Sequence, residues 1–510
     1  MRLPFPERIP LPAAFVAATI LAGLQQLQRT NLYFTLYSFL FIVIATIAFN
    51  AAGGFTRPSG SYVFFYAVLG LILGIVYKAY LGEPGESNLR SPILTMQVFT
   101  GGITGMLIAV LVSRKISRKK PLLGNILKQK DMRNAAIGCF AFGVFLKTMN
   151  VIIPHQDGSV LSAITQLDRF LEMSVILATL YTVRKSRGRS GFGLLVLVAI
   201  GISVCFGIIG FSKEGMFVPL FCWLVAAASL RLNMRISYMV AIGVVVYTMF
   251  HILVPFSQYG RTQVQEQATV ADRVQLGYTL LSDVDALRAQ YLAVDSDTEA
   301  EDEIAMAYYD TPQGFFDRLT MIGPDDALVN YTAQGRFTGL SVIPAYFANW
   351  IPHFLWPNKP NFGAGNFYAH LIGGILSEDD FTTGISFTPS GEAYQLAGWT
   401  GIFVVAPLIW IMLFTVFDSL TGDVRESPWG LLIIAMFSHV APEGQLNGAI
   451  YIMWFGGVAV TFVALTTTYA MPVIGTLLAG PEQTGLVRLR RRFMPTAVAP
   501  TRSDPSQSSA

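Results

Sequence analysis

The chain has 510 residues, of which 53% are hydrophobic and only 13% are charged. A soluble protein usually carries about 25% charged residues, so this composition excludes an ordinary soluble domain. The net charge is only +3, and we expect no nucleic-acid partner. The three cysteines, Cys139, Cys205 and Cys222, all lie in apolar runs, which excludes a disulfide framework in the polar part of the chain.

Apolar runs of membrane-spanning length recur along the chain. A helix of about 20 apolar residues crosses the ~30 Å hydrocarbon core of a bilayer. The runs predict about twelve transmembrane helices, near residues 10–26, 31–52, 61–80, 92–112, 134–153, 160–183, 191–211, 214–230, 236–255, 399–419, 428–446 and 448–470. We therefore expect an all-α integral membrane protein, a polytopic helix bundle.

The loops between these spans alternate in charge. Basic clusters lie at 114–133, 184–189, 231–235 and 488–492, whereas the loops at 82–88, 154–159 and 441–448 are poor in Lys and Arg. Basic loops stay on the cytoplasmic side of a membrane. This alternation predicts a multi-pass protein of the plasma membrane with both termini in the cytoplasm.

One long polar stretch interrupts the apolar sequence and divides the chain into four parts. Residues 1–255 hold the first nine predicted spans, and residues 256–398 form a large loop domain that the charge pattern places outside the cell. Residues 399–470 hold the last three spans. Residues 471–510 are predicted to be a cytoplasmic, basic and disordered tail, because the end of the tail is rich in Pro, Ser and Thr.

The polar stretch contains a proline-rich, aromatic string, IPHFLWPNKP, at 351–360. Three prolines in ten residues exclude a long helix, and the neighbouring aromatic rings suit a membrane interface. Aromatic faces also suit sugar rings, and Arg or Lys suit phosphate. The string is followed by a Gly- and Asn-rich stretch and by TTGISFTPSGEAYQLAGWTG at 382–401, which returns the chain to an apolar span.

These segments resemble the bacterial repeat-unit polymerases of surface polysaccharides, the Wzy-type O-antigen or exopolysaccharide polymerases. The resemblance covers about a tenth of the chain by residue, together with the whole topology, and His353 departs from the Arg that is usual in the string. The turn Phe211-Ser-Lys-Glu-Gly215 also resembles a turn of this group. The matching positions in the string are Ile351, Pro352, Phe354, Leu355, Trp356, Pro357, Lys359 and Pro360.

The resemblance implies transfer chemistry at the outer face of the plasma membrane. Such enzymes are glycosyltransferases that join oligosaccharide units carried on undecaprenyl pyrophosphate. Neither a nucleotide sugar nor a metal is needed, because the leaving group is already a pyrophosphate, and we expect no cofactor. The implied partners are the lipid-linked oligosaccharide, membrane lipid, and a chain-length regulator and flippase of the same pathway.

Three residues are candidates for catalysis. Arg318 is chosen because the family often has an Arg upstream of the proline-rich string. Glu392, just before a span, and Glu214, between two spans, are candidate bases for the acceptor hydroxyl. The structural alternative for Glu214 is that Ser212 caps the next helix and Glu214 complements its dipole. Glu392 has the same alternative of a helix N-terminal carboxylate.

The candidate substrate-binding residues are cations, one aromatic residue and one histidine in or near the external loops. Lys213 precedes Glu214, and Lys359 and Trp356 belong to the proline-rich string; snorkelling to lipid phosphate is the alternative for Lys359. The set is Lys213, Arg261, Arg336, Trp356, Lys359 and His439. The histidines lack metal-ligand spacing, so no metal site is predicted.

Two other functions share this topology. An O-antigen ligase would use the same donor with a different acceptor, and the sequence does not separate it from a polymerase. A lipid-linked oligosaccharide flippase or transporter also suits twelve spans, although no matched pair of broken helices is found in the two halves. Glycosyltransferases with a catalytic acid in the first external loop are disfavoured, because residues 25–31 contain neither Asp nor Glu.

Overall fold

The computed structural model describes residues 1–153, 167–263, 270–285 and 287, and most of 306–480. These residues form helices and no strand, with two isolated bridges, Arg2 to Asn233 and Phe387 to Gly444. The first half of the chain contains α1 (Leu11–Leu27), α2 (Leu32–Ala52), α3 (Pro58–Ala67), α4 (Leu73–Leu81), α5 (Pro92–Ile116), α6 (Met132–Ile152), α8 (Phe170–Lys185), α9 (Leu194–Ile209), α10 (Lys213–Ser229) and α11 (Ile236–Gln263).

The second half begins with shorter helices and ends with apolar ones. The polar stretch holds α12 (Val270–Ser282), α15 (Ile322–Ala333), α16 (Ile343–Ala348) and α17 (Ala364–Ile372). Short single turns at Phe316–Leu319 and Leu340–Val342 lie between them. The chain then forms α18 (Pro389–Thr400), α19 (Ala406–Thr421), α20 (Pro428–Glu443), α21 (Gln445–Tyr451), α22 (Gly457–Tyr469) and α23 (Met471–Ala479).

Within the described part of the chain, seven helical stretches are long and apolar enough to cross a membrane, so the expected all-α membrane fold is confirmed at that level. They are Leu32–Ala52, Pro58–Leu81, Pro92–Ile116, Gln129–Ile152, Ile236–Arg261, Pro389–Thr421 and Gln445–Tyr469. The other five predicted spans fall on α1, α8, α9, α10 and α20, which have 16 or 17 residues each. Residues 160–166 of the predicted sixth span lie outside the described part of the chain.

Local sequence signals explain several helix ends. The Asn31 side chain accepts a hydrogen bond from the Tyr33 backbone N–H and so caps α2. Gly53 follows α2 with a φ of 95°, a left-handed conformation that glycine adopts without strain. Inside the stretch Pro389–Thr421, Ala397 and Gly398 leave helical geometry and kink the chain. This kink falls next to residue 399, where the sequence predicted a span to begin.

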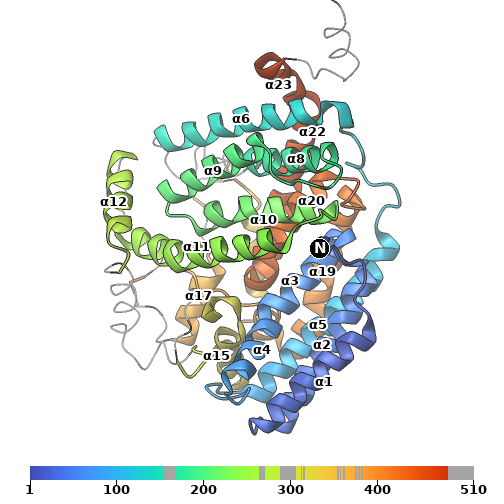
Figure 1. Ribbon diagram of the computed structural model, residues 1–510. Helices are drawn as coiled ribbons and strands as arrows, with labels where there is room; N and C mark the ends of the chain where they lie inside the picture. The colour runs from blue at the N-terminus through green and yellow to red at the C-terminus, as the bar shows by residue number, and fades with distance from the viewer. Residues whose placement is uncertain are drawn as a thin grey trace, which may run out of the picture.

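The helices form two packed groups (Figure 1). Helices α6, α8, α9, α10 and α11 run side by side, and α1, α2, α3, α5 and α19 form a second group that crosses them. Helix α20 contacts α3 in one group and both α8 and α10 in the other. A continuous buried core of aromatic and aliphatic side chains, including Trp410, Trp429 and Tyr62, joins the groups.

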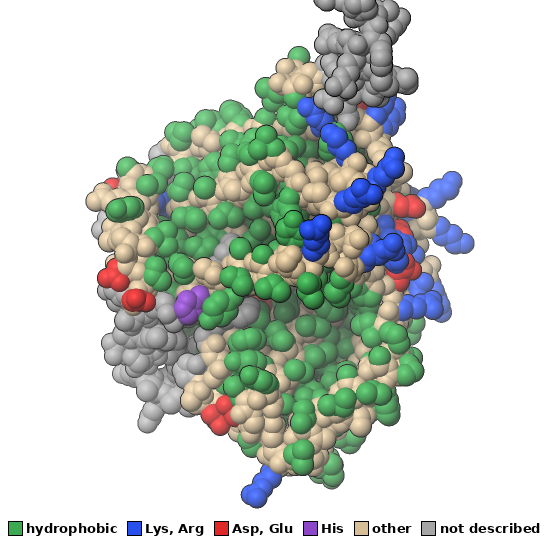
Figure 2. Space-filling model, in the orientation of Figure 1, with side chains coloured by type: hydrophobic (Ala, Val, Ile, Leu, Met, Phe, Trp, Pro, Cys, Tyr) green, Lys and Arg blue, Asp and Glu red, His purple; other side chains and the backbone are tan. Residues whose placement is uncertain are grey.

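Hydrogen bonds tie the basic loops together at one end of the bundle. The backbone N–H of Leu3 donates to Leu232 at 2.9 Å, and that of Asn233 donates to Gly188 at 3.0 Å. The loop after α5 joins the end of α19, where Leu122 N–H donates to the carbonyl of Ser419 at 2.9 Å. Lys and Arg side chains gather along one edge of the molecule (Figure 2). The sequence alternation therefore corresponds to two opposite ends of the helix bundle.

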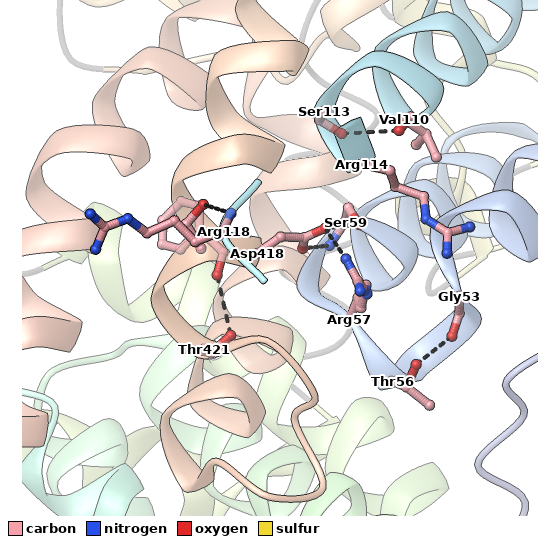
Figure 3. Close-up of polar contacts among 12 residues, drawn as sticks. Gly53, Thr56, Arg57, Ser59, Val110, Ser113, Arg114, Arg118, Asp418 and Thr421 are labelled. Atoms are coloured by element: carbon pink, nitrogen blue, oxygen red, sulfur yellow. Dashed lines mark hydrogen bonds and ion pairs between the residues drawn. The ribbon is translucent and has the colours of Figure 1, made fainter. Parts of the chain in front are cut away.

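A buried carboxylate stabilises this basic end. Asp418, at the end of α19, accepts hydrogen bonds from the Ser59 N–H at 3.1 Å and the Ser59 hydroxyl at 2.8 Å. The Arg57 guanidinium lies 3.9 Å from the same carboxylate, as Figure 3 shows. Asp418 thus accepts an otherwise unpaired N–H in the first turn of α3 and is itself compensated by a cation.

The C-terminal region, residues 471–510, was predicted to be a disordered tail, but it begins with helix α23 (Met471–Ala479). Helix α23 packs along α6, and Asn134 donates to the Thr476 hydroxyl at 2.8 Å. Added Cβ atoms at Gly138 and Gly475 would lie 2.1 Å and 1.9 Å from backbone oxygens of the other helix. These two glycines permit a close backbone approach that polarity alone does not predict. Residues 481–510 lie outside the described chain.

Candidate functional site

Charged side chains converge at the end of the bundle opposite the basic loops. Arg169 immediately precedes α8, and its Nη1 lies 3.4 Å from Glu214 Oε1 in α10 and 3.9 Å from Glu172 Oε1 in α8. On the end of α20, His439 Nδ1 lies 3.4 Å from Glu443 Oε2. Helix α20 contacts both α8 and α10, so the two pairs lie on neighbouring helices. We call Arg169, Glu172, Glu214, His439 and Glu443 the charged cluster.

The turn before α10 positions two of the predicted residues. The Ser212 side chain accepts from the Gly215 N–H at 3.1 Å, and Glu214 stands in the first helical turn. This is the capping arrangement that the sequence offered as the structural alternative. Arg261 joins the same turn from α11, because its Nε donates to the Phe211 carbonyl at 2.9 Å. Lys213, Glu214 and Arg261 are thus brought together as neighbours.

Arg169 and Glu172 are residues of this site that the sequence did not single out. The Nε atom of Arg169 is buried and has no hydrogen-bond partner among the described residues, and the same is true of Glu172 Oε2. A buried guanidinium N–H without a partner is costly, which favours binding of an additional acceptor. The sequence signal was present: Asp168, Arg169 and Glu172 are isolated charges within a predicted span, and such charges are functional candidates by default.

Asp168 and Lys147 extend the cluster towards α6. Lys147 Nζ lies 3.6 Å from Asp168 Oδ2, and the carboxylate also accepts from the Phe170 N–H at 3.2 Å. Asp168 is therefore a buried carboxylate with a cation close by at the start of α8.

The segment after α20 holds His439 and Glu443 in place. Gln445 has a φ of 57°, so the chain bends sharply between α20 and α21. A second segment supports this bend: the Ser386 hydroxyl lies 3.4 Å from Glu443 Oε2, and Phe387 forms a bridge with Gly444. The His439 side chain is 62% exposed, so it remains accessible while its Nδ1 is oriented by a carboxylate.

Glu392 lies behind this bend and is fully buried. One carboxylate oxygen accepts from the Tyr346 hydroxyl at 2.5 Å, and the other accepts from the backbone N–H groups of Leu446 and Asn447. These N–H groups belong to the first turn of α21 and have no partner within that helix. Glu392 thus caps α21 from a neighbouring helix, which favours a positioning role over contact with substrate.

The proline-rich string lies next to α21 but outside the charged cluster. Trp350 stacks on Trp454 with ring centroids 5.3 Å apart, and its indole N–H donates to the carbonyl of Ile450. Trp356 is 41% exposed, and Lys359 Nζ donates to the Ile351 carbonyl at 2.8 Å. Partial burial lowers the pKa of Lys359. His353, Phe354, Pro357 and Pro360 of the string lie outside the described residues.

The remaining predicted arginines lie elsewhere on the same end. Arg336 is exposed, and its guanidinium lies 5.1 Å from the centre of the Tyr331 ring. Arg318 belongs to the short turn Phe316–Leu319, which packs on α4 through a stack of Phe316 on Tyr77. Its side chain is outside the described part of the structure. No described contact joins either arginine to the charged cluster.

Comparisons with known proteins add no assignment to this site. No family model matches the chain, and neither the curated proteins nor the solved structures gave a match.

Proposed function

We propose that the protein is a polymerase that joins undecaprenyl-pyrophosphate-linked oligosaccharide repeat units at the outer face of the plasma membrane. The observation that carries the proposal is the charged cluster at the end of an all-helical membrane protein opposite its basic loops. The resemblance of the 351–401 region supports the substrate class. In this proposal all twelve predicted spans cross the membrane, the basic end is cytoplasmic, and residues 256–398 form the external domain.

The reaction requires two kinds of group. An acceptor hydroxyl attacks the anomeric carbon of the donor chain, and the bond from that carbon to the pyrophosphate oxygen breaks with both electrons leaving on the oxygen. The proton of the hydroxyl passes to a base on the protein. A cation near the leaving oxygen stabilises the developing charge, and a base within hydrogen-bond reach of the hydroxyl accepts the proton.

The charged cluster offers both groups. Arg169 and the neighbouring Lys213 and Arg261 provide cations for the pyrophosphate, and Arg is well suited to bidentate binding of its oxygens. His439 is the proposed base, since its Nδ1 contacts Glu443 and its ring is accessible. Glu214 is proposed to orient Arg169, because a carboxylate 3.4 Å from a guanidinium is a poor proton acceptor. Glu392 holds the bend that carries Glu443.

Deletion of the gene, followed by sizing of surface and lipid-linked glycans on gels, tests the function. A polymerase deletion is expected to leave single lipid-linked repeat units outside the cell and no long polymer. Restoration of the polymer by the wild-type gene is the control. Full-length polymer that stays on its lipid carrier would instead indicate a ligase, and repeat units confined to the cytoplasmic face would indicate a flippase. Unchanged glycans would remove the saccharide assignment altogether.

A further inference from the structure

Helix α12 has an unusual position at the edge of the molecule. It follows α11 after a short gap in the described chain and turns across the end of that helix (Figure 1). It also contacts α9, so it runs over the ends of two neighbouring helices. If α9 and α11 cross the bilayer, α12 lies roughly in the plane of the membrane surface.

One face of α12 packs on the protein. Gly277 and Leu280 are buried, and Leu280 joins a small apolar cluster with Phe211 and Phe256. A Cβ atom added at Gly277 would lie 3.6 Å from the Phe256 ring, so the two helices are in close contact here. Phe211 lies against Phe256 and also provides the carbonyl that holds Arg261, so α12 is joined through this cluster to the turn that leads to Lys213 and Glu214.

The rest of α12 divides into two stripes of different chemistry. Val274, Tyr278 and Leu281 are 51%, 77% and 37% exposed, and their spacing of four and three residues places them on one apolar stripe. Gln275, Thr279 and Ser282 are also exposed and form a polar stripe. At about 100° per residue, the apolar stripe lies between the buried face and the polar stripe, roughly 100° from each, and the polar stripe points away from the protein.

The apolar stripe continues a surface that suits lipid. Only 19% of the most apolar part of α11 is buried within the protein, and Val240, Val244 and Tyr247 are among its most exposed residues. In Figure 2, hydrophobic side chains cover the face of the molecule along which α11 runs, up to the edge where α12 lies. A helix with one face on the protein, one apolar stripe and one polar stripe fits the boundary between acyl chains and water.

We infer that α12 is an interfacial helix that rests in the headgroup region of the outer leaflet. Its partner is the bilayer itself: Val274, Tyr278 and Leu281 face the acyl chains, and Gln275, Thr279 and Ser282 face water. Tyrosine is enriched at this depth, where its ring is apolar and its hydroxyl is hydrated. Because α12 shares an apolar cluster with Phe211, it fixes the turn with Lys213 and Glu214 at the headgroup level. That last consequence rests on the proposed function, since this is the depth at which a lipid-linked pyrophosphate lies.

Nitroxide labels on the two stripes test the inference in the full-length protein. Single cysteines are introduced by Val274→Cys, Tyr278→Cys and Leu281→Cys, with Gln275→Cys and Thr279→Cys as matched controls on the adjacent stripe. Cys205 is exposed and is replaced by Ala, whereas Cys139 and Cys222 are buried and shielded from the label. The labelled protein is reconstituted in vesicles of phosphatidylethanolamine and phosphatidylglycerol, and collisions with oxygen and with a water-soluble nickel chelate are measured.

The expected result is a reversal of accessibility between neighbouring positions. Labels at 274, 278 and 281 should collide more often with oxygen, and labels at 275 and 279 should collide more often with the nickel chelate. Equal access of the nickel chelate to both stripes would overturn the inference, because it would place α12 in water. Dipolar broadening between labels at 278 would also overturn it, since a second copy of the chain would then cover the stripe. Neither result depends on catalytic activity, so failure here is distinguishable from failure of the proposed function.

Discussion

The two ends of the bundle treat buried carboxylates differently. At the basic end, Asp418 accepts from Ser59 and also lies 3.9 Å from the Arg57 guanidinium. At the opposite end, Glu392 is held by the Tyr346 hydroxyl and two backbone N–H groups. Asp325 accepts from the Thr388 N–H and hydroxyl. Neither of these two carboxylates has an ion pair among the described residues.

The number of hydrogen-bond partners distinguishes side chains that hold the fold together from side chains that are available to bind a ligand. Carboxylates that cap helices with every oxygen occupied hold α15, α18 and α21 together, and they have little capacity left for a ligand. The charged cluster has the opposite character: its ion pairs are 3.4 Å or longer, and it retains buried polar atoms without partners among the described residues. Variants that affect polymer formation without affecting stability should therefore map to this cluster.

The largest effect is expected from Arg169→Ala. Loss of the guanidinium removes the proposed cation at the leaving pyrophosphate, and removal of one such electrostatic donor costs about 10²–10³ in rate. Polymer formed from lipid-linked repeat units should fall by that factor at matched protein levels. Arg189→Ala, an exposed residue of the basic end, is the control and should be unaffected. Normal polymer in the Arg169 variant would exclude the cluster as the site of transfer.

His439→Gln should have the next largest effect. The amide preserves polar character but cannot accept the hydroxyl proton, and loss of a general base typically costs about 10²-fold or more. Glu443→Gln should lower the rate less, because it weakens only the orientation of the ring. Initial rates of polymer formation in membranes check this order. A Glu443 variant slower than the His439 variant would contradict the assignment of His439 as the base.

Glu392→Gln should act through stability. Its amide nitrogen would face either the Tyr346 hydroxyl or the N–H groups of Leu446 and Asn447, and each buried donor left without an acceptor costs about 1–3 kcal/mol. The melting temperature of the purified protein should fall. The added change Tyr346→Phe removes one competing donor, so the double variant should recover part of the loss. No loss in the single variant would show that the cap contributes little.

The sequence predicted the helices well because apolar length and loop charge are local properties. The spans predicted at 31–52 and 92–112 fall on the helices Leu32–Ala52 and Pro92–Ile116, and these spans and the Ser212 cap depend only on neighbouring residues. Glu392 was recognised as a residue before a span, but its partners at 346 and 446 come from distant elements. Likewise, the pairing of Arg169 with Glu214 became visible only when α8 and α10 were placed side by side. The site required the packing of the helices, which hydropathy does not specify.

The pH dependence of stability offers a smaller effect at Asp325. Burial raises the pKa of Asp325 to about 7, although hydrogen bonds from Thr388 oppose the change. Between pH 3.8 and about pH 7, Asp325 keeps its proton in the folded protein but has lost it in the unfolded chain. The free energy of unfolding therefore falls as the pH rises through this window. Asp325→Asn lacks that dependence.

Melting temperatures of the wild type and the Asp325→Asn variant, measured in detergent from about pH 5 to pH 8, check this prediction. The melting temperature of the Asp325→Asn variant should rise relative to that of the wild type as the pH rises. A difference between wild type and the Asp325 variant that stays constant with pH would contradict a proton bound at Asp325.

The smallest effect is expected from Lys359→Ala. The ammonium group donates to the Ile351 carbonyl within its own loop and has no described contact with the charged cluster. An exposed hydrogen bond contributes about 0.5–1.5 kcal/mol, so we expect a loss of polymer of about tenfold or less with folding intact. Gel sizing beside Arg169→Ala gives the comparison. Complete loss of polymer in the Lys359 variant would move the pyrophosphate site from the helix ends to the proline-rich string, and the string would then have to approach Arg169 when substrate binds.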